Sequence, residues 1–149
     1  MNWSSELLSD PDFSITADQA TNTNGTYWET EPGWTIESGE AVLTNPSQEG
    51  YDLVENAGGT NDNTITPGAT YQISYEITAV NGGSVKARIG HTDGEVQNSI
   101  GQYTEKITAS TVPSQGVRAL RIRSAVGFTG TITVDNISVQ EVHDIRFYD

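Results

Sequence analysis

Cysteine is absent from this chain of 149 residues, and basic residues are few. The lack of cysteine excludes disulfide bonds, thiolate metal sites and cysteine nucleophiles. Seven lysines and arginines stand against 20 acidic residues, so the formal net charge is −13. Because phosphate contacts need basic side chains, this balance argues against nucleic-acid binding. The acidic residues are scattered along the chain, which indicates a solvated surface.

Long apolar runs are also missing. No stretch approaches the roughly 20 apolar residues that a membrane-spanning helix needs. The opening MNWSSELLSD has neither the basic nor the apolar region of a signal peptide. We therefore expect no membrane partner and no export through a cleaved signal. Helical periodicity is absent too, and one domain is the usual content of a chain this long.

Short segments rich in valine, isoleucine, threonine and tyrosine are separated by glycine-containing turns, a pattern typical of a β-sandwich or barrel. Residues 70–80 form the clearest strand, because apolar side chains from Tyr71 to Ala79 alternate with polar ones. Asn81-Gly82-Gly83 predicts a tight hairpin with residues 84–90 as its return strand. We expect further strands at residues 33–37, 40–44, 51–55, 103–109, 117–124 and 131–142, and an edge strand from residues 6–8 and Phe13.

Two stretches depart from this regularity. The alternation of the last strand slips at Asp135-Asn136, which predicts a β-bulge. Residues 18–32 form a long polar loop that carries Tyr27 and Trp28. His91 lies in a turn-forming segment and matches no catalytic motif.

Basic residues gather in an otherwise acidic chain. Arg121 and Arg123 point outward if Leu120 and Ile122 point inward, and they could join Arg118, Lys86 and Arg88 in one stripe. Two interpretations remain: the stripe binds a ligand, or its side chains offset acidic neighbours. The second is the simpler.

The order of motifs resembles the carbohydrate-binding-module-like (galactose-binding-like) jelly rolls of secreted glycosidases and of tailed-bacteriophage structural proteins. The residues that carry the likeness are 6–13 (ELLSDPDF), 33–36 (GWTI), 39–43 (GEAVL), 66–75 (TPGATYQISY) and 130–139 (GTITVDNISV). The resemblance implies an all-β, antiparallel jelly-roll sandwich of about 8–10 strands in a single domain over residues 1–149. Its core would span residues 6–142, with extended tails at residues 1–5 and 143–149.

The resemblance also implies a structural calcium ion where the first and last strands meet. Asp135 is the candidate ligand, with Asp12 or Asp10 beside it. The alternative is that the polar side chains of a bulge satisfy backbone groups. The chain has Asp10-Pro11 where the family usually has Asn-Gly, and no other cofactor is expected.

Large aromatic side chains are the candidate contacts with a ligand or partner. Trp34 lies in a family strand that packs the core, whereas Trp28 and Tyr27 lie in a polar loop. The tails add Trp3, Phe147 and Tyr148, which either pack on their own domain or form arms that dock on neighbouring subunits.

No nucleophile elbow, phosphate-binding loop or other catalytic motif is present, so we expect no enzyme activity. The sequence favours a bacteriophage virion accessory protein, such as a capsid decoration protein, made in the host cytoplasm. It would bind the major capsid protein or another virion protein through its edges and arms, as a monomer or a homo-oligomer. The alternative is a carbohydrate-binding module, or a tail or fibre component, that binds glycans through loop aromatics.

Overall fold

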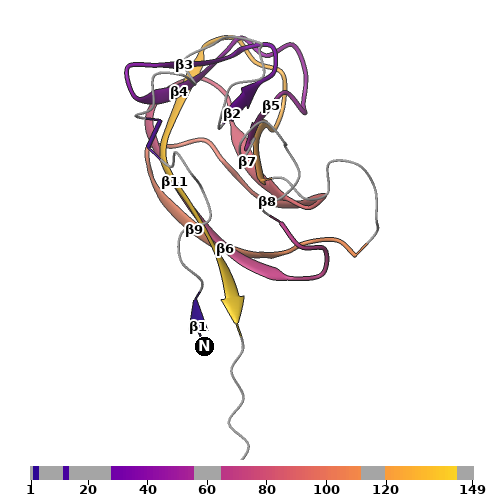
Figure 1. Ribbon diagram of the computed structural model, residues 1–149. Coiled ribbons are helices and arrows are strands. Elements are labelled where there is room, and N and C mark those ends of the chain that lie inside the picture. Colours follow the sequence, from indigo (N-terminus) through magenta and orange to yellow (C-terminus); the bar gives the residue numbers. More distant parts are fainter. Residues whose placement is uncertain (1, 4–11, 14–27, 56–64, 112–119, 144–149) are drawn as a thin grey trace, which may run out of the picture.

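The computed structural model describes residues 2–3, 12–13, 28–55, 65–111 and 120–143 (Figure 1). Within these ranges the regular structure is entirely β, and none of it forms an apolar helix long enough to cross a membrane. The strands are β1 (Asn2–Trp3), β2 (Trp28–Thr30), β3 (Trp34–Glu37), β4 (Glu40–Thr44), β5 (Asp52–Glu55), β6 (Thr70–Asn81), β7 (Val85–Ile89), β8 (Thr92–Gln97), β9 (Gly101–Thr108), β10 (Leu120–Ser124) and β11 (Thr131–His143).

The strands form two antiparallel sheets that face each other. One sheet has the order β3-β4-β11-β6-β9, with β1 paired to the end of β11, and the other has the order β2-β5-β10-β7-β8. Figure 1 shows the long strands β6, β9 and β11 in one layer and β5, β7 and β8 in the other. The predicted all-β, antiparallel sandwich is therefore confirmed, with 11 strands in the described residues.

The core lies between the sheets and follows the period-2 alternation of the sequence. On β6, Tyr71, Ile73, Tyr75 and Ile77 are buried and the residues between them are partly exposed. Trp34 also packs in the core as predicted, and its indole N–H donates to the carbonyl of Tyr51 at 2.9 Å. Each buried isoleucine or leucine contributes about 1.5–3 kcal/mol relative to an exposed one.

The bulge predicted at Asp135-Asn136 is confirmed. The register of β11 against β6 shifts between Asp135 and Ser138, and Asn136 has a φ of 50°. This extra residue returns Ile137 to the core. A second shift, between Thr133 and Val134, explains why Ala79 is exposed although the alternation predicted it inward.

The hairpin predicted at Asn81-Gly82-Gly83 is wrong, because β6 and β7 lie in different sheets. A two-residue hairpin there needs positive φ at Asn81 and Gly82. In the structure the positive φ values fall one residue later, at Gly82 (97°) and Gly83 (88°). The turn therefore carries the chain across the sandwich, and the end of β6 pairs with β11.

Three strands, β1, β2 and β8, were not predicted. Strand β2 lies inside the expected loop at residues 18–32, and β8 follows His91, where only a turn was expected. Strand β1 pairs with Val142 and His143, so residues 2–3 join a sheet of their own domain. The expected edge strand at residues 6–8 lies outside the described residues.

We predict that Gly82→Ala destabilises the fold much more than Gly39→Ala. Both glycines have positive φ, which costs an alanine about 1–2 kcal/mol. A Cβ at Gly82 would also lie 2.8 Å from the carbonyl oxygen of Thr129, whereas a Cβ at Gly39 would meet nothing within 4 Å. Urea unfolding measures the difference, and equal losses for both variants would contradict the crossing geometry.

Candidate functional site

Trp28, expected as an exposed loop aromatic, is a core residue. It lies on β2, is 1% exposed, and its ring packs 5.1 Å from that of Phe13. Strand β2 alternates, so Trp28 and Thr30 point inward and Glu29 points outward. A buried indole cannot stack on a sugar, and the prediction of a ligand contact at Trp28 is therefore corrected.

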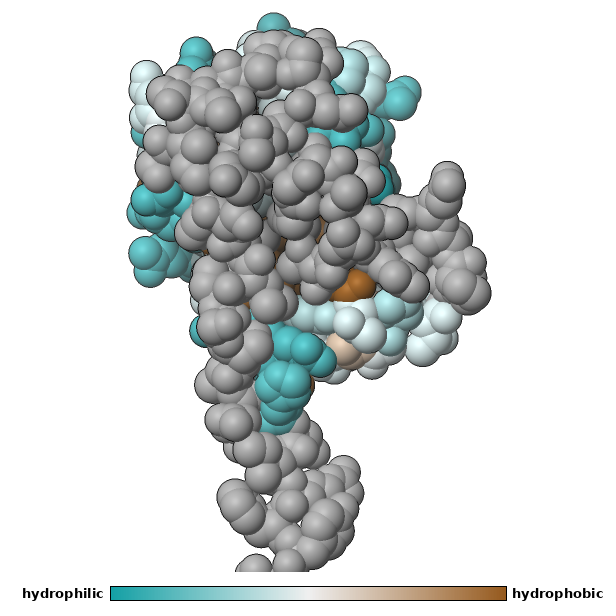
Figure 2. Space-filling model, viewed as in Figure 1, coloured by the Kyte–Doolittle hydropathy of each residue, from teal (hydrophilic) through white to brown (hydrophobic). Residues whose placement is uncertain are grey.

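The other predicted aromatic contacts are not reached by the structure. Tyr27, Phe147 and Tyr148 lie outside the described residues, and of Trp3 only the backbone is described. The large apolar side chains that are exposed within the described ranges are Val96, Ile100 and Val126, none of them aromatic. On the face that Figure 2 shows, the coloured residues are mainly teal to white, with a small brown patch. The described surface therefore offers hydrogen-bonding groups rather than an aromatic platform.

The calcium site expected at Asp135 is described only in part, because Asp10 lies outside the described residues, and it stays a prediction. The Asn136 N–H donates to Oδ1 of Asp135 at 2.7 Å, and the Asn136 amide donates to Glu76 at 2.9 Å. Burial raises the pKa of Asp135, and the charges of Glu40, Asp12 and Glu76 raise it further. Asp12 is thus near Asp135 as predicted, but no group of three potential ligands forms in the part of the chain that the structure describes. Asp10 lies outside it.

Cations from two neighbouring strands form a compact block on the outer face of the five-stranded sheet. Arg121 of β10 is paired in register with Arg88 of β7, and Arg123 with Lys86. Four of the seven basic residues of the chain thus occupy adjacent positions. Their neighbours in sequence, such as Ile122 and Ala87, point into the core. We call this block, with Asp52 and Asp93, the charged face.

Asp52 is the centre of the charged face. It is 1% exposed, and its carboxylate accepts hydrogen bonds from Arg121 (2.9 Å) and twice from Arg123 (2.8 and 2.9 Å). The Asp52 N–H donates to Glu31 at 2.8 Å. The hydrogen bond to Asp52 raises the pKa of Arg123, and burial raises the pKa of Glu31. These bonds hold both guanidinium groups in fixed positions.

Asp93 of β8 closes the other side of the charged face. It accepts hydrogen bonds from Arg88 at 2.9 Å and lies 3.1 Å from the ammonium group of Lys86, which also contacts Glu49 at 3.3 Å. Burial alone would raise the pKa of Asp93, but the bonds from Lys86 and Arg88 lower it. These four side chains do offset acidic neighbours, as the simpler interpretation of the basic stripe expected, and this leaves ligand binding by the same face open. Arg118 lies outside the described part.

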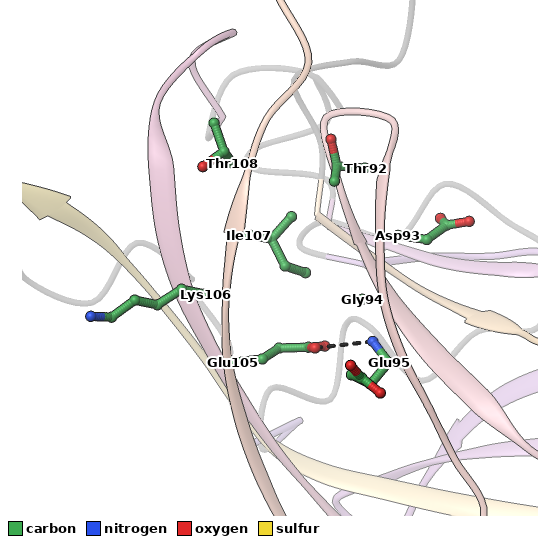
Figure 3. A pocket seen from close by; sticks show the side chains of 8 residues that line it. All are labelled: Thr92, Asp93, Gly94, Glu95, Glu105, Lys106, Ile107 and Thr108. Carbon is green, nitrogen blue, oxygen red and sulfur yellow. Dashed lines mark hydrogen bonds between the residues drawn. The ribbon is translucent and has the colours of Figure 1, made fainter.

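A hollow adjoins the charged face between β8 and β9, beside Asp93 (Figure 3). It has a volume of about 330 Å³ and holds the Glu105 carboxylate, which accepts a hydrogen bond from the Glu95 N–H at 3.0 Å. Two further hollows, of about 170 and 360 Å³, lie on the outer face of the other sheet. One is lined by residues such as Ser74, Gln102 and Asn136, the other by residues such as Glu40 and Thr78.

Sequence reasoning missed Asp52 and Asp93, although it found their cationic partners. The partners of Asp52 stand 69 and 71 residues further along the chain, so no local pattern joins them. One signal was present: Asp52 opens a short apolar strand, Leu53-Val54, in which a charge needs a partner.

We predict that Asp52→Asn is far more destabilising than Asp93→Asn. Removing the buried charge leaves two largely buried guanidinium groups without their carboxylate, a change that costs about 3–5 kcal/mol. The side chain of Asp93 is 34% exposed, and comparable surface pairs contribute about 1 kcal/mol or less. Urea unfolding of both variants checks this, and similar losses would show that Asp52 does not organise the face.

The stability of the fold should decrease as the pH rises above about 4.5. The pKa values of Glu31 and Glu105 are raised from 4.5, and that of Asp135 from 3.8, in each case chiefly by burial. The native state therefore binds more protons than the unfolded chain in this window, and unfolding becomes easier with rising pH. The pKa of Asp93 is lowered from 3.8, so Asp93 makes the fold more stable as the pH rises, but only below pH 3.8.

Urea unfolding at pH 4.5, 5.5 and 7 measures this slope. Glu105→Gln should be at least as stable as the native chain at pH 7 and should show a shallower slope, because it removes a buried charge. A stability that rises over this range would contradict the assignment.

No protein-family model matches the chain, and no curated protein matches it in sequence. Solved structures do match. A CBM4 carbohydrate-binding module has a TM-score of 0.52 and 17% identity, over 91% of this chain and 99% of its own. The CBM29-2 module has a TM-score of 0.53 and 10% identity, over 94% of this chain and 91% of its own.

Two further features of these matches bear on function. Solved variants of CBM29-2, made to probe ligand recognition by family 29 carbohydrate-binding modules, replace a tyrosine, a lysine, an aspartate or an arginine by alanine. An arabinofuranosidase also matches, with a TM-score of 0.55 and 13% identity, over 91% of this chain but 26% of its own. At these identities the likeness shows the fold: this chain is a jelly-roll β-sandwich of the kind found in carbohydrate-binding modules.

Proposed function

We propose that the chain is a non-catalytic carbohydrate-binding module and that it binds a neutral glycan on the charged face. The observation that carries the proposal is the fixed set of hydrogen-bonding groups around Asp52 on the outer face of the five-stranded sheet. The virion interpretation of the sequence has no support among the matching structures, so carbohydrate binding replaces it as the preferred function.

The charged face has the chemistry that sugars need. A sugar hydroxyl donates one hydrogen bond and accepts others, and bonds to charged groups are about twice as strong as neutral ones. Arg88, Arg121 and Asp93 keep part of their side chains at the surface, so they can be reached. Because salt bridges already hold these side chains in place, ligand binding costs little side-chain conformational entropy.

The balance of charge favours a neutral ligand. The four cations of the block share three carboxylates, those of Asp52, Asp93 and Glu49. The charge of Arg121 also acts on Glu31, so the block as a whole is close to neutral. The net charge of −13 for the whole chain adds repulsion toward acidic or sulfated polysaccharides. The lysine, arginine and aspartate probed in CBM29-2 are the same residue types, which further supports this face.

We predict that Arg88→Ala weakens glycan binding about 10- to 100-fold, since a hydrogen bond to a charged group contributes about 1.5–3 kcal/mol. The matched control is Gln72→Ala, which removes a long polar side chain from the outer face of β6 in the opposite sheet. The full chain is first tested by affinity electrophoresis against xylan, β-glucan, mannan, galactan and arabinan, and then by calorimetry with each variant.

Circular dichroism should show that both variants keep the native fold. Binding to none of these polysaccharides would contradict the proposed function. Equal losses for Arg88→Ala and Gln72→Ala would contradict the proposed face.

A further inference from the structure

The side of the sandwich where β8 faces β9 combines two hydrogen bonds between the sheets with a hollow. Among the strands that the structure describes, each of these two is the last of its sheet and has one edge without a partner strand. Two hydrogen bonds bridge the gap: Ser110 N–H to the carbonyl of Gly90 at 2.9 Å, and Glu95 N–H to the Glu105 carboxylate at 3.0 Å. The hollow of about 330 Å³ opens beside these two bridges and is lined by residues 92–95 and 105–108.

Glu105 places an acceptor inside this hollow. Figure 3 shows Glu105 and Ile107 pointing from β9 toward β8, while Lys106 points away. Oε1 of Glu105 is buried against Gly94 and has no hydrogen-bond partner within the described residues. A buried acceptor without a donor costs about 1–3 kcal/mol, so a ligand that donates to this carboxylate is favoured. Ile107 supplies an apolar wall.

The hollow continues the charged face. Asp93 accepts hydrogen bonds from Arg88 on the sheet and also lines the hollow. A glycan that crosses β10 and β7 therefore reaches the hollow at the sheet edge. The volume is at the lower end of the range of about 300–1,000 Å³ for small-molecule sites, which suits one sugar ring rather than several.

We propose that the hollow between β8 and β9 is a separate subsite that binds the terminal residue of a neutral glycan, an inference that rests on the proposed function. Adjacent hydroxyl groups of the sugar donate to the Glu105 carboxylate. The hydrogen bonds from Ser110 to Gly90 and from Glu95 to Glu105 close the gap between the two strand edges. A glycan therefore cannot pass between the sheets and must end in the hollow. The carboxylates of Glu95 and Glu105 disfavour a uronic acid by charge repulsion.

An extended peptide is the competing occupant, because strand edges can pair with a further strand. Two features disfavour it. The side chain of Glu105 occupies the space that an added strand would need, and β8 has a register irregularity opposite Lys86 and Arg88 that breaks the regular ladder. A sugar needs no such ladder.

The test compares Glu105→Gln with Glu76→Gln, the same substitution on the outer face of the six-stranded sheet. The probes are hexasaccharides of xylose, glucose and mannose and the polymers of the same linkages, measured by calorimetry on the full chain. Glu105→Gln should weaken binding of the matching hexasaccharide about tenfold, because a charged acceptor becomes neutral. Its effect on the polymer, which has few ends, should be small, and Glu76→Gln should change neither.

Amide resonances give a second readout that does not depend on a variant. The hexasaccharide should shift the Glu95 and Gly94 resonances in ¹H–¹⁵N spectra, since the Glu95 N–H donates to Glu105. Binding that Arg88→Ala weakens and Glu105→Gln does not would overturn the subsite and leave the proposed function intact. Shifts of these resonances that a threonine–valine peptide causes and the sugar does not would also overturn the sugar subsite. If no glycan binds at all, both the subsite and the proposed function are contradicted.

Discussion

Burial of every second side chain between the two sheets is the constraint on which the rest of the molecule depends. Leu120 and Ile122 on β10, like Val85, Ala87 and Ile89 on β7, fill the core. Their positions force the intervening cations outward, and the antiparallel register then places Arg121 beside Arg88 and Arg123 beside Lys86. The charged face is therefore a direct consequence of how the core is packed.

Such a block of like charges is unstable unless carboxylates accompany it. Asp52 and Asp93 lie on the two strands that flank the pair, β5 and β8, and each accepts bonds from two of the cations. The result is a double row of cations with a carboxylate on each side, fixed before any ligand arrives. A surface of this kind can exchange some of its solvent for sugar hydroxyls without rearranging, which is the physical basis of the proposed function.

The sequence allowed the strands of the core to be predicted because their alternation is local. Residues 70–80 and the bulge at Asp135-Asn136 follow from side-chain period alone. The pairing of strands is not local, and this is why Asn81-Gly82-Gly83 was taken for a hairpin although it crosses between sheets. The pairing of Asp52 with Arg121 and Arg123 was missed for the same reason, since it is set by tertiary structure.

The prediction for Trp28 failed for a different physical reason. A short strand inside a polar segment gives too few residues to show its alternation, so the polarity of the segment outweighed the tendency of tryptophan to be buried. The calcium prediction rested on the resemblance alone, and the described residues around Asp135 satisfy one another without forming a ligand set.

The central claim is that a glycan lies across the outer face of the five-stranded sheet. The most direct test is to map backbone amide shifts of the ¹⁵N-labelled full chain while a bound oligosaccharide is added. The account predicts shifts along β7 and β10, centred on Arg88 and Arg121. Shifts confined to β4, β6 and β11, across the outer face of the opposite sheet, would contradict it.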